Sequence, residues 1–148
     1  MIELARKTRV IRGLSPDQVP FDDLLADGQP VILEGLARAW PLVARGLESH
    51  ASAAAYLKRF CSNKPTMVYV GEPAIAGRFF YNPEFTGFNF ERQRITLDEC
   101  IDRVLKHADD PRAPALYAGS TDVDIYLPGL RTENDLKLDH PTFHGNPP

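Results

Sequence analysis

The sequence has no long run of apolar residues, and this absence excludes one class of protein. None of its stretches approaches the roughly 18 consecutive apolar residues that a membrane-spanning helix needs. The N-terminal segment, MIELARKTRVIRGLS, mixes acidic and basic side chains and lacks the apolar region of a secretory signal. We therefore expect no membrane association and a cytoplasmic location.

Cysteine is also scarce. Cys61 and Cys100 are the two cysteines of the 148-residue chain, and they do not form a CxxC pair. This excludes the disulfide framework of a small secreted domain and the paired cysteines of a zinc ribbon. We expect two buried, reduced thiols, as in a cytoplasmic protein.

An excess of positive charge is missing as well. The formal net charge is −3, and the pI is about 5.8. Proteins that bind nucleic acid usually carry a basic patch or stripe. We therefore do not expect nucleic acid to be a partner.

The common sequence motifs of catalysis are absent. The chain contains no GxGxxG, GxxxxGK[ST] or GxSxG motif and no Cys-His constellation. Asp122 and Asp124 stand two residues apart, but the glycine and glutamate of an EF-hand loop do not accompany them. These two carboxylates are typical of a turn.

The C-terminal segment LDHPTFHGNPP holds the one clustered set of candidate metal ligands. His140 and His144 are four residues apart, and Asp139 precedes the first histidine. Histidines at this spacing share a helix face in some zinc sites, but Pro141 between them disfavours a helix. A solvated loop is the expected structure, and a small metalloenzyme that uses His140 and His144 remains an alternative.

Proline is abundant, with 13 residues, and favours many turns and short elements over a helical bundle. Apolar periodicity, capping residues and turn residues together predict short strands and helices out of βαβα order, which indicates an α+β fold. Strands are expected at residues 8–11, 65–71 and 114–120, and a buried strand at 31–33. Helical turns are expected at 15–28, helices within 49–61 (with Ser52 as a possible cap) and 95–110 (with Thr96 as the cap), and an irregular stretch at 131–148.

Aromatic residues concentrate in one segment, FFYNPEFTGFNF, at residues 79–90. Such density usually indicates a hydrophobic core. The functional alternative is a pocket wall in which the hydroxyl group of Tyr81 supplies an oriented polar group. Tyr117 allows the same two interpretations, since a buried tyrosine on an apolar strand needs a partner for its hydroxyl group.

Four stretches, taken in order, resemble the N-terminal half of the cupin-like (JmjC-related) oxygenases. They are PVILEGLARAWPLV, FFYNPEFTGFNF, ITLDECIDRVL and APALYAGSTDVDIYLPGL. The family includes the asparaginyl hydroxylase that inhibits hypoxia-inducible factor. The resemblance covers most of residues 28–135.

This resemblance implies a double-stranded β-helix (a cupin or jelly-roll barrel) that binds Fe(II) with an H-x-D/E … H triad and binds 2-oxoglutarate. Such enzymes use O₂ to hydroxylate a substrate, which in the family is a protein, a tRNA or a small molecule. By position, Tyr117 matches the tyrosine that helps to bind 2-oxoglutarate. Tyr81 matches a tyrosine at the pocket entrance, where it would contact the substrate.

The chain departs from the family pattern after the L-P-x-L turn at residues 127–130. In the family a strand with the H-x-D motif follows shortly, whereas we expect no such H-x-D or H-x-E motif anywhere in these 148 residues. We therefore expect residues 1–148 to form a single partial domain with an incomplete barrel, and residues 131–148 to be a connector toward missing strands. The iron triad and the basic residue that would pair with 2-oxoglutarate would then be absent, and neither cofactor would bind tightly.

Two further functions remain open beside an oxygenase fragment that is inactive by itself. The chain is alternatively a non-catalytic interaction module, or a homodimer that covers the free edges of an unfinished sheet. The metalloenzyme based on His140 and His144 is the third possibility, with Asp122 or Asp124 as a further ligand.

Overall fold

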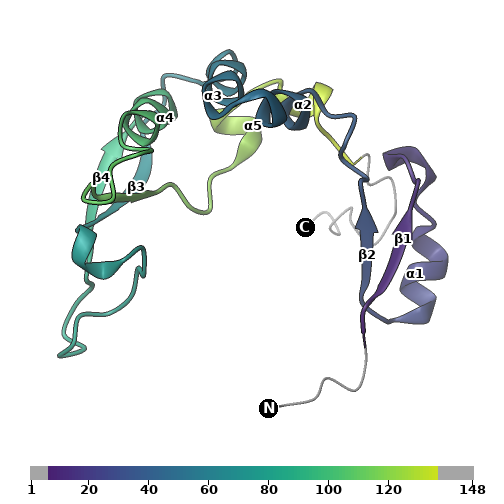
Figure 1. Ribbon diagram of the computed structural model, residues 1–148, viewed down its shortest axis with the longest axis horizontal. Helices are drawn as coiled ribbons and strands as arrows, with labels where there is room; N and C mark the ends of the chain where they lie inside the picture. The colour runs from purple at the N-terminus through teal and green to yellow at the C-terminus, as the bar shows by residue number, and fades with distance from the viewer. Residues whose placement is uncertain (1–6, 137–148) are drawn as a thin grey trace, which may run out of the picture. The chain divides into compact units, whose positions relative to one another are not determined.

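The computed structural model describes residues 7–136, and these form short strands and helices (Figure 1). The strands are β1 (Arg9–Arg12), β2 (Val31–Glu34), β3 (Thr66–Gly71), β4 (Glu91–Ile95) and β5 (Ala115–Tyr117). The helices are α1 (Phe21–Asp27), α2 (Pro41–Glu48), α3 (His50–Lys58), α4 (Leu97–Lys106), α5 (Val123–Tyr126) and α6 (Leu130–Glu133), with 3-10 helices η1 (Pro16–Gln18) and η2 (Pro73–Ile75). Within residues 7–136 no helix is long and apolar enough to cross a membrane.

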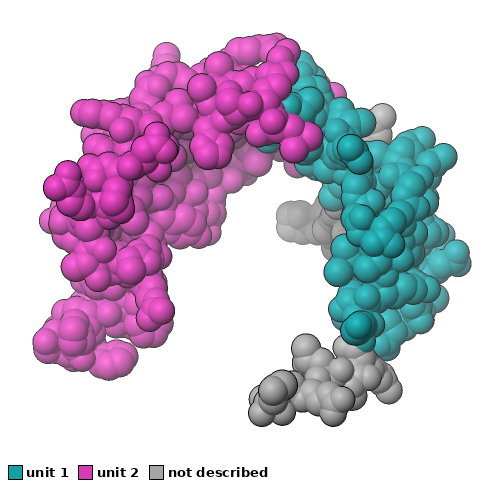
Figure 2. Space-filling view, viewed as in Figure 1, with its two compact units in different colours: residues 1–44, 133–148 teal, residues 45–132 magenta. Residues whose placement is uncertain are grey.

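The chain divides into two units, residues 1–44 with 133–148 and residues 45–132 (Figure 2). In the first unit, β1 and β2 pair in parallel, with Val10 opposite Ile32. The chain between them forms η1 and α1. Gly28 ends α1 in the left-handed conformation, with a φ of 59°, and donates its N–H to the carbonyl of Leu24. Glycine adopts this conformation without steric cost, so the predicted helix end is confirmed.

The prediction that residues 31–33 form a buried strand is wrong in one respect. β2 is a strand, but its residues alternate between half-buried and exposed, and the side chain of Ile32 is 51% exposed. A two-stranded sheet covers less surface than a complete parallel sheet, whose strands are buried on both faces. The apolar run therefore predicted the strand correctly and its burial incorrectly.

The predicted irregular stretch at residues 131–148 begins inside a helix. α6 extends to Glu133, and the buried Asn134 follows it. The side-chain oxygen of Asn134 accepts a hydrogen bond from the backbone N–H of Leu42 at 3.0 Å. This bond satisfies one of the N–H groups that the first turn of α2 leaves without a helical partner. Residues 137–148 of the predicted connector lie outside the described residues.

The second unit contains an antiparallel sheet with the strand order β4-β3-β5. The predicted strand at residues 65–71 is confirmed as the central strand β3, which begins one residue later at Thr66. β4 was not predicted from the sequence, because Glu-Arg-Gln-Arg has few β-branched or aromatic side chains. Its pairing with β3 over five residue pairs, from Thr66 opposite Ile95 to Val70 opposite Glu91, accounts for its extended backbone.

Two helices of this unit begin at side-chain caps. The hydroxyl group of Thr96 accepts a hydrogen bond from the backbone N–H of Glu99, so the predicted start of α4 is confirmed. α3 begins earlier than expected, because Ser49 rather than Ser52 is the cap and accepts from the N–H of Ser52. α3 and α4 are linked by the ammonium group of Lys58, which lies 2.7 Å from a carboxylate oxygen of Asp102.

The core of the second unit lies between α4 and one face of the sheet. Val68 of β3 is fully buried, with 0% of its surface exposed. Its neighbour across the sheet, Gln93, accepts a hydrogen bond from the guanidinium group of Arg103 on α4 at 2.8 Å. The other buried apolar residues described in this unit are Ala54, Tyr56, Leu97, Cys100 and Leu130. Neither α3 nor α4 covers the opposite face of this sheet.

The mixture of helices and strands confirms the α+β prediction. Neither the β1-β2 sheet nor the β4-β3-β5 sheet closes into a barrel within residues 7–136. The double-stranded β-helix therefore stays a prediction, as does the assignment of residues 1–148 to a single partial domain.

Candidate functional site

The sheet face that points away from α4 carries a row of three polar-tipped side chains. Tyr69 of β3 lies opposite Arg92 of β4 on one side and opposite Tyr117 of β5 on the other. Residues directly opposite each other in antiparallel strands project from the same face. Since Val68 and Gln93 face α4, the adjacent Tyr69 and Arg92 face the other way.

Tyr117 is on this open face, and its side chain is 50% exposed. Its ring stacks on that of Tyr69, with centroids 5.9 Å apart and an interplanar angle of 28°. The ring also lies against the backbone of Gly119, where any side chain would overlap it. Among residues 7–136, no hydrogen bond to the hydroxyl group of Tyr117 is observed.

A continuous series of ring contacts connects Tyr117 to Tyr81. Tyr117 contacts Phe79 at a centroid distance of 5.7 Å, and Phe79 contacts Phe90 at 5.6 Å. Phe90 stacks on Phe88 at 4.9 Å, and Phe88 stacks on Tyr81 at 5.2 Å. These distances are in the range of favourable aromatic pairs. The structure therefore brings the two tyrosines selected from the sequence into one aromatic surface.

We call this set of rings the aromatic face. It consists of Tyr69, Phe79, Tyr81, Phe88, Phe90 and Tyr117. None of these six rings is buried in the described part of the chain, and Tyr81 is 49% exposed. The interpretation of residues 79–90 as hydrophobic core is therefore wrong, and the pocket-wall alternative agrees with the observed exposure.

The loop after Tyr81 is held by one asparagine. The side-chain oxygen of Asn82 accepts hydrogen bonds from the backbone N–H groups of Thr86 at 3.0 Å and Gly87 at 3.2 Å. The backbone N–H of Asn82 donates a hydrogen bond to the carbonyl of Gly87. Asparagine favours such turns because its short side chain mimics a backbone acceptor. The loop thereby returns Phe88 to the ring of Tyr81.

Arg92 is the residue of this site that sequence reasoning missed. Its guanidinium carbon lies 5.2 Å from the centroid of the Phe88 ring, which is the geometry of a cation–π contact. Arg92 and Arg94 are both exposed, and neither has a carboxylate partner within residues 7–136. The alternation of Arg92, Gln93 and Arg94 was the available signal, because it places both arginines on one face if the segment is a strand.

The described residues do not fit an iron centre. Within residues 7–136 no group of three or more His, Cys, Asp or Glu side chains is placed to hold a metal ion. Asp122 caps α5 and accepts hydrogen bonds from the backbone N–H groups of Asp124 and Ile125, as expected for a turn carboxylate. Asp124 lies 3.4 Å from the guanidinium group of Arg131. Asp139, His140 and His144 lie outside the described residues, so their assignment stays a prediction.

One H-x-D triplet, His107-Ala108-Asp109, occurs before the L-P-x-L turn, so the expectation that the chain contains no H-x-D is wrong. It forms the turn that ends α4, and the backbone N–H of His107 donates to the carbonyls of Arg103 and Val104. Asp109 is exposed. The triplet is therefore a helix terminus rather than the metal-binding strand of an oxygenase.

The two thiols are free, and neither is activated as a nucleophile. Burial raises the pKa of the Cys100 thiol, and burial also raises the pKa of the Cys61 thiol. Cys100 is buried as expected, whereas Cys61 is only half-buried. Thiols with a raised pKa contain little of the reactive thiolate at neutral pH.

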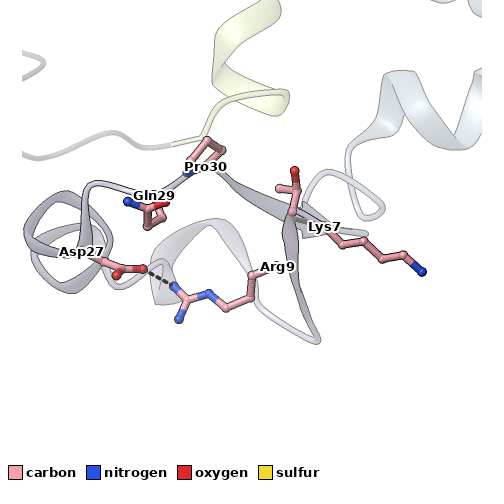
Figure 3. A pocket seen from close by; sticks show the side chains of 6 residues that line it. Lys7, Arg9, Asp27, Gln29 and Pro30 are labelled. Atoms are coloured by element: carbon pink, nitrogen blue, oxygen red, sulfur yellow. Dashed lines mark ion pairs between the residues drawn. The ribbon is translucent and has the colours of Figure 1, made fainter. Parts of the chain in front are cut away.

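A cavity of about 430 Å³ lies in the first unit (Figure 3). It is lined by Lys7, Thr8, Arg9, Asp27, Gln29 and Pro30. The guanidinium group of Arg9 lies 3.3 Å from the carboxylate of Asp27, and the Lys7 side chain extends away from this pair (Figure 3). The two central charges therefore satisfy each other, and the aromatic face remains the stronger candidate site.

Comparison with known protein families matches residues 16–148 to the cupin-like domain. A search of curated proteins finds no match, and a search of solved structures finds none either. The closer similarity to an asparaginyl hydroxylase therefore has no support beyond the family itself.

Proposed function

Since the chain belongs to the cupin-like domain family, which includes Fe(II)- and 2-oxoglutarate-dependent oxygenases, we propose that it forms part of such a hydroxylase. In this proposal the aromatic face is the wall against which 2-oxoglutarate and the substrate bind. The observation that supports it most strongly is the position of Tyr117. A tyrosine matched by position to a 2-oxoglutarate ligand lies half-exposed on an open sheet face, with its hydroxyl group unpartnered within residues 7–136.

Tyr117 would donate a hydrogen bond from its hydroxyl group to a carboxylate of 2-oxoglutarate. Hydrogen bonds to an ionised acceptor are about twice as strong as those between neutral groups. The stacked ring of Tyr69 and the contact with Gly119 restrict the ring of Tyr117. A restricted ring loses less conformational entropy when its hydroxyl group binds a ligand.

Tyr81 would contact the substrate. Its ring is stacked on Phe88, and the turn at Asn82 fixes the backbone beside it. Exposed rings in contact with one another present an apolar surface with a polar tip at the tyrosine. This arrangement suits a substrate that is itself partly apolar, whereas the identity of that substrate stays open.

Iron is not assigned to the described residues. Because residues 7–136 contain no cluster that fits a metal ion, we derive no step of the reaction through iron. In a complete hydroxylase of this family, Fe(II) activates O₂ for the hydroxylation. We propose that the 148-residue chain by itself contributes binding residues and does not catalyse hydroxylation.

The proposal predicts that Tyr117→Phe weakens the binding of 2-oxoglutarate. Loss of one hydrogen bond to a carboxylate removes about 1.5–3 kcal/mol, which corresponds to roughly tenfold or more in affinity. Saturation-transfer NMR on the 148-residue chain measures this weak affinity directly.

Tyr126→Phe is the matched control, since Tyr126 lies on α5 and takes no part in the ring contacts of the aromatic face. The affinity of this variant should equal that of the wild-type chain. Equal affinity in the wild-type and Tyr117→Phe chains, or no binding to the wild-type chain, would contradict the proposed role of Tyr117.

A further inference from the structure

The outer edge of β4 combines two features that point to a binding partner. β4 is an edge strand of the β4-β3-β5 sheet, so its outward backbone groups are not paired by another described strand (Figure 1). Arg92 and Arg94 project from the aromatic face of this strand. Edge strands are open to pairing with another extended chain.

The two arginines are available for ion pairing. Some described cations have carboxylate partners, for example Lys58 with Asp102 and Arg103 with Glu99. Arg92 and Arg94 have none among residues 7–136. Stacking of the Arg92 guanidinium on the ring of Phe88 orients the group and leaves its N–H donors free.

The spacing of the arginines specifies the pattern of the partner. Arg92 and Arg94 are two residues apart, so they lie on the same face of β4 with one residue between them. In an added strand, the residues opposite them would also be two apart and on that face. Opposite charges directly across two strands are favourable, which selects an acid-x-acid sequence.

We propose that the edge of β4 binds an extended acidic peptide as a fourth strand, with alternate carboxylates opposite Arg92 and Arg94. The peptide would lie beside the aromatic face, with its carboxylates on the side of the sheet that carries Arg92 and the ring of Phe88. This binding requires neither iron nor 2-oxoglutarate. It goes beyond the proposed hydroxylase role and stands or falls independently of it.

The charge distribution favours a short acidic peptide over nucleic acid. The whole chain has a net charge of −3, and Glu91 lies at the start of β4 on the face that carries Gln93. Charges further than about 8 Å apart are largely screened at physiological ionic strength. A peptide with two acidic side chains therefore interacts mainly with the local arginines. A nucleic acid carries a negative charge every few ångströms, and those charges would be repelled by the other acidic groups of the protein.

The test uses the full 148-residue chain and a capped peptide with the sequence Thr-Val-Asp-Val-Asp-Val-Thr. Fluorescence anisotropy of the labelled peptide gives the affinity, and amide chemical shifts of the isotope-labelled chain locate the site. We expect binding that weakens with added salt and shifts that concentrate in β4. The double variant Arg92→Glu/Arg94→Glu should lower the affinity by about tenfold or more, because it replaces two attractions with two repulsions.

Lys64→Glu/Arg112→Glu is the matched control, since it changes the net charge equally at two exposed cations that are not part of β4. It should leave the affinity within about twofold of wild type if the local arginines matter rather than the net charge. A companion peptide with asparagine in place of each aspartate should bind at least fivefold more weakly.

Each alternative outcome overturns the inference. Equal binding of the aspartate and asparagine peptides would remove the acidic requirement, and shifts outside β4 would place the site elsewhere. Tighter binding of a single-stranded oligonucleotide than of the peptide would assign the arginines to nucleic acid. No peptide binding at all would leave β4 a free edge, without affecting the Tyr117 test.

Discussion

At the scale of single residues, Tyr117 depends on the absence of a side chain two positions later. A methyl group at Gly119 would overlap the phenol end of the Tyr117 ring. The ring end is half-exposed and can swing aside, so the cost in stability is small whereas the change in the position of the hydroxyl group is large. Gly119 is therefore expected to position Tyr117 rather than to stabilise the fold.

We predict that Gly119→Ala changes the free energy of unfolding by less than about 1 kcal/mol and moves the ring of Tyr117. The ring proton resonances of Tyr117 and its contacts with Tyr69 should change, and the affinity for 2-oxoglutarate should fall as in Tyr117→Phe. Gly46→Ala is the control, since no atom lies within 4 Å of the added carbon. Unchanged Tyr117 resonances in Gly119→Ala would refute the positioning role.

The individual site residues differed in how far the sequence could predict them. Tyr81 and Tyr117 were selected by their position in the resemblance, and the structure brings them into one surface through three intervening rings. Arg92 was missed because its importance depends on pairing with Tyr69, a residue distant in the chain. Single-sequence patterns carry the local period of a strand but not the identity of its neighbour across the sheet.

At the scale of elements, α4 shows how local chemistry determines a boundary. The hydroxyl group of Thr96 accepts a hydrogen bond from the backbone N–H of Glu99 in the first turn, where no helical carbonyl is available. The first turn also carries Asp98, and the last turn carries Lys106, as the helix dipole favours. α4 was therefore predicted with its correct start.

We predict that Thr96→Ala lowers the free energy of unfolding by about 1 kcal/mol, the usual contribution of an N-cap hydroxyl group. Thr96→Ser should retain most of the stability, because it preserves the acceptor. Urea denaturation followed by circular dichroism measures both variants. A loss in Thr96→Ser as large as that in Thr96→Ala would show that the methyl group, rather than the cap, is responsible.

The elements that the sequence missed are those that depend on distant partners. β4 has a polar sequence, and its extended backbone results from pairing with β3. β2 was correctly placed by its apolar run, but its burial depends on how many layers cover it. Capping and turn signals act within a few residues, whereas sheet pairing and burial are set by the whole fold.

At the scale of the whole molecule, membership of the cupin-like domain family rests on residues 16–148. The order of the four stretches that resemble the family predicted this membership from the sequence. The helix and strand mixture was also predictable from the alternation of capping residues, apolar runs and prolines. The division into two units could not be predicted from the sequence, because no linker-like composition separates residues 44 and 45.

The central claim is that the aromatic face is a binding site for 2-oxoglutarate. The most direct measurement titrates 2-oxoglutarate into the isotope-labelled 148-residue chain and maps the amide chemical shifts, with sodium chloride of equal ionic strength as the reference. The account predicts that the shifts concentrate at Tyr69 of β3 and Tyr117 of β5 and disappear in Tyr117→Phe. Shifts confined to residues 7–44, or a shift pattern that Tyr117→Phe leaves unchanged, would contradict it.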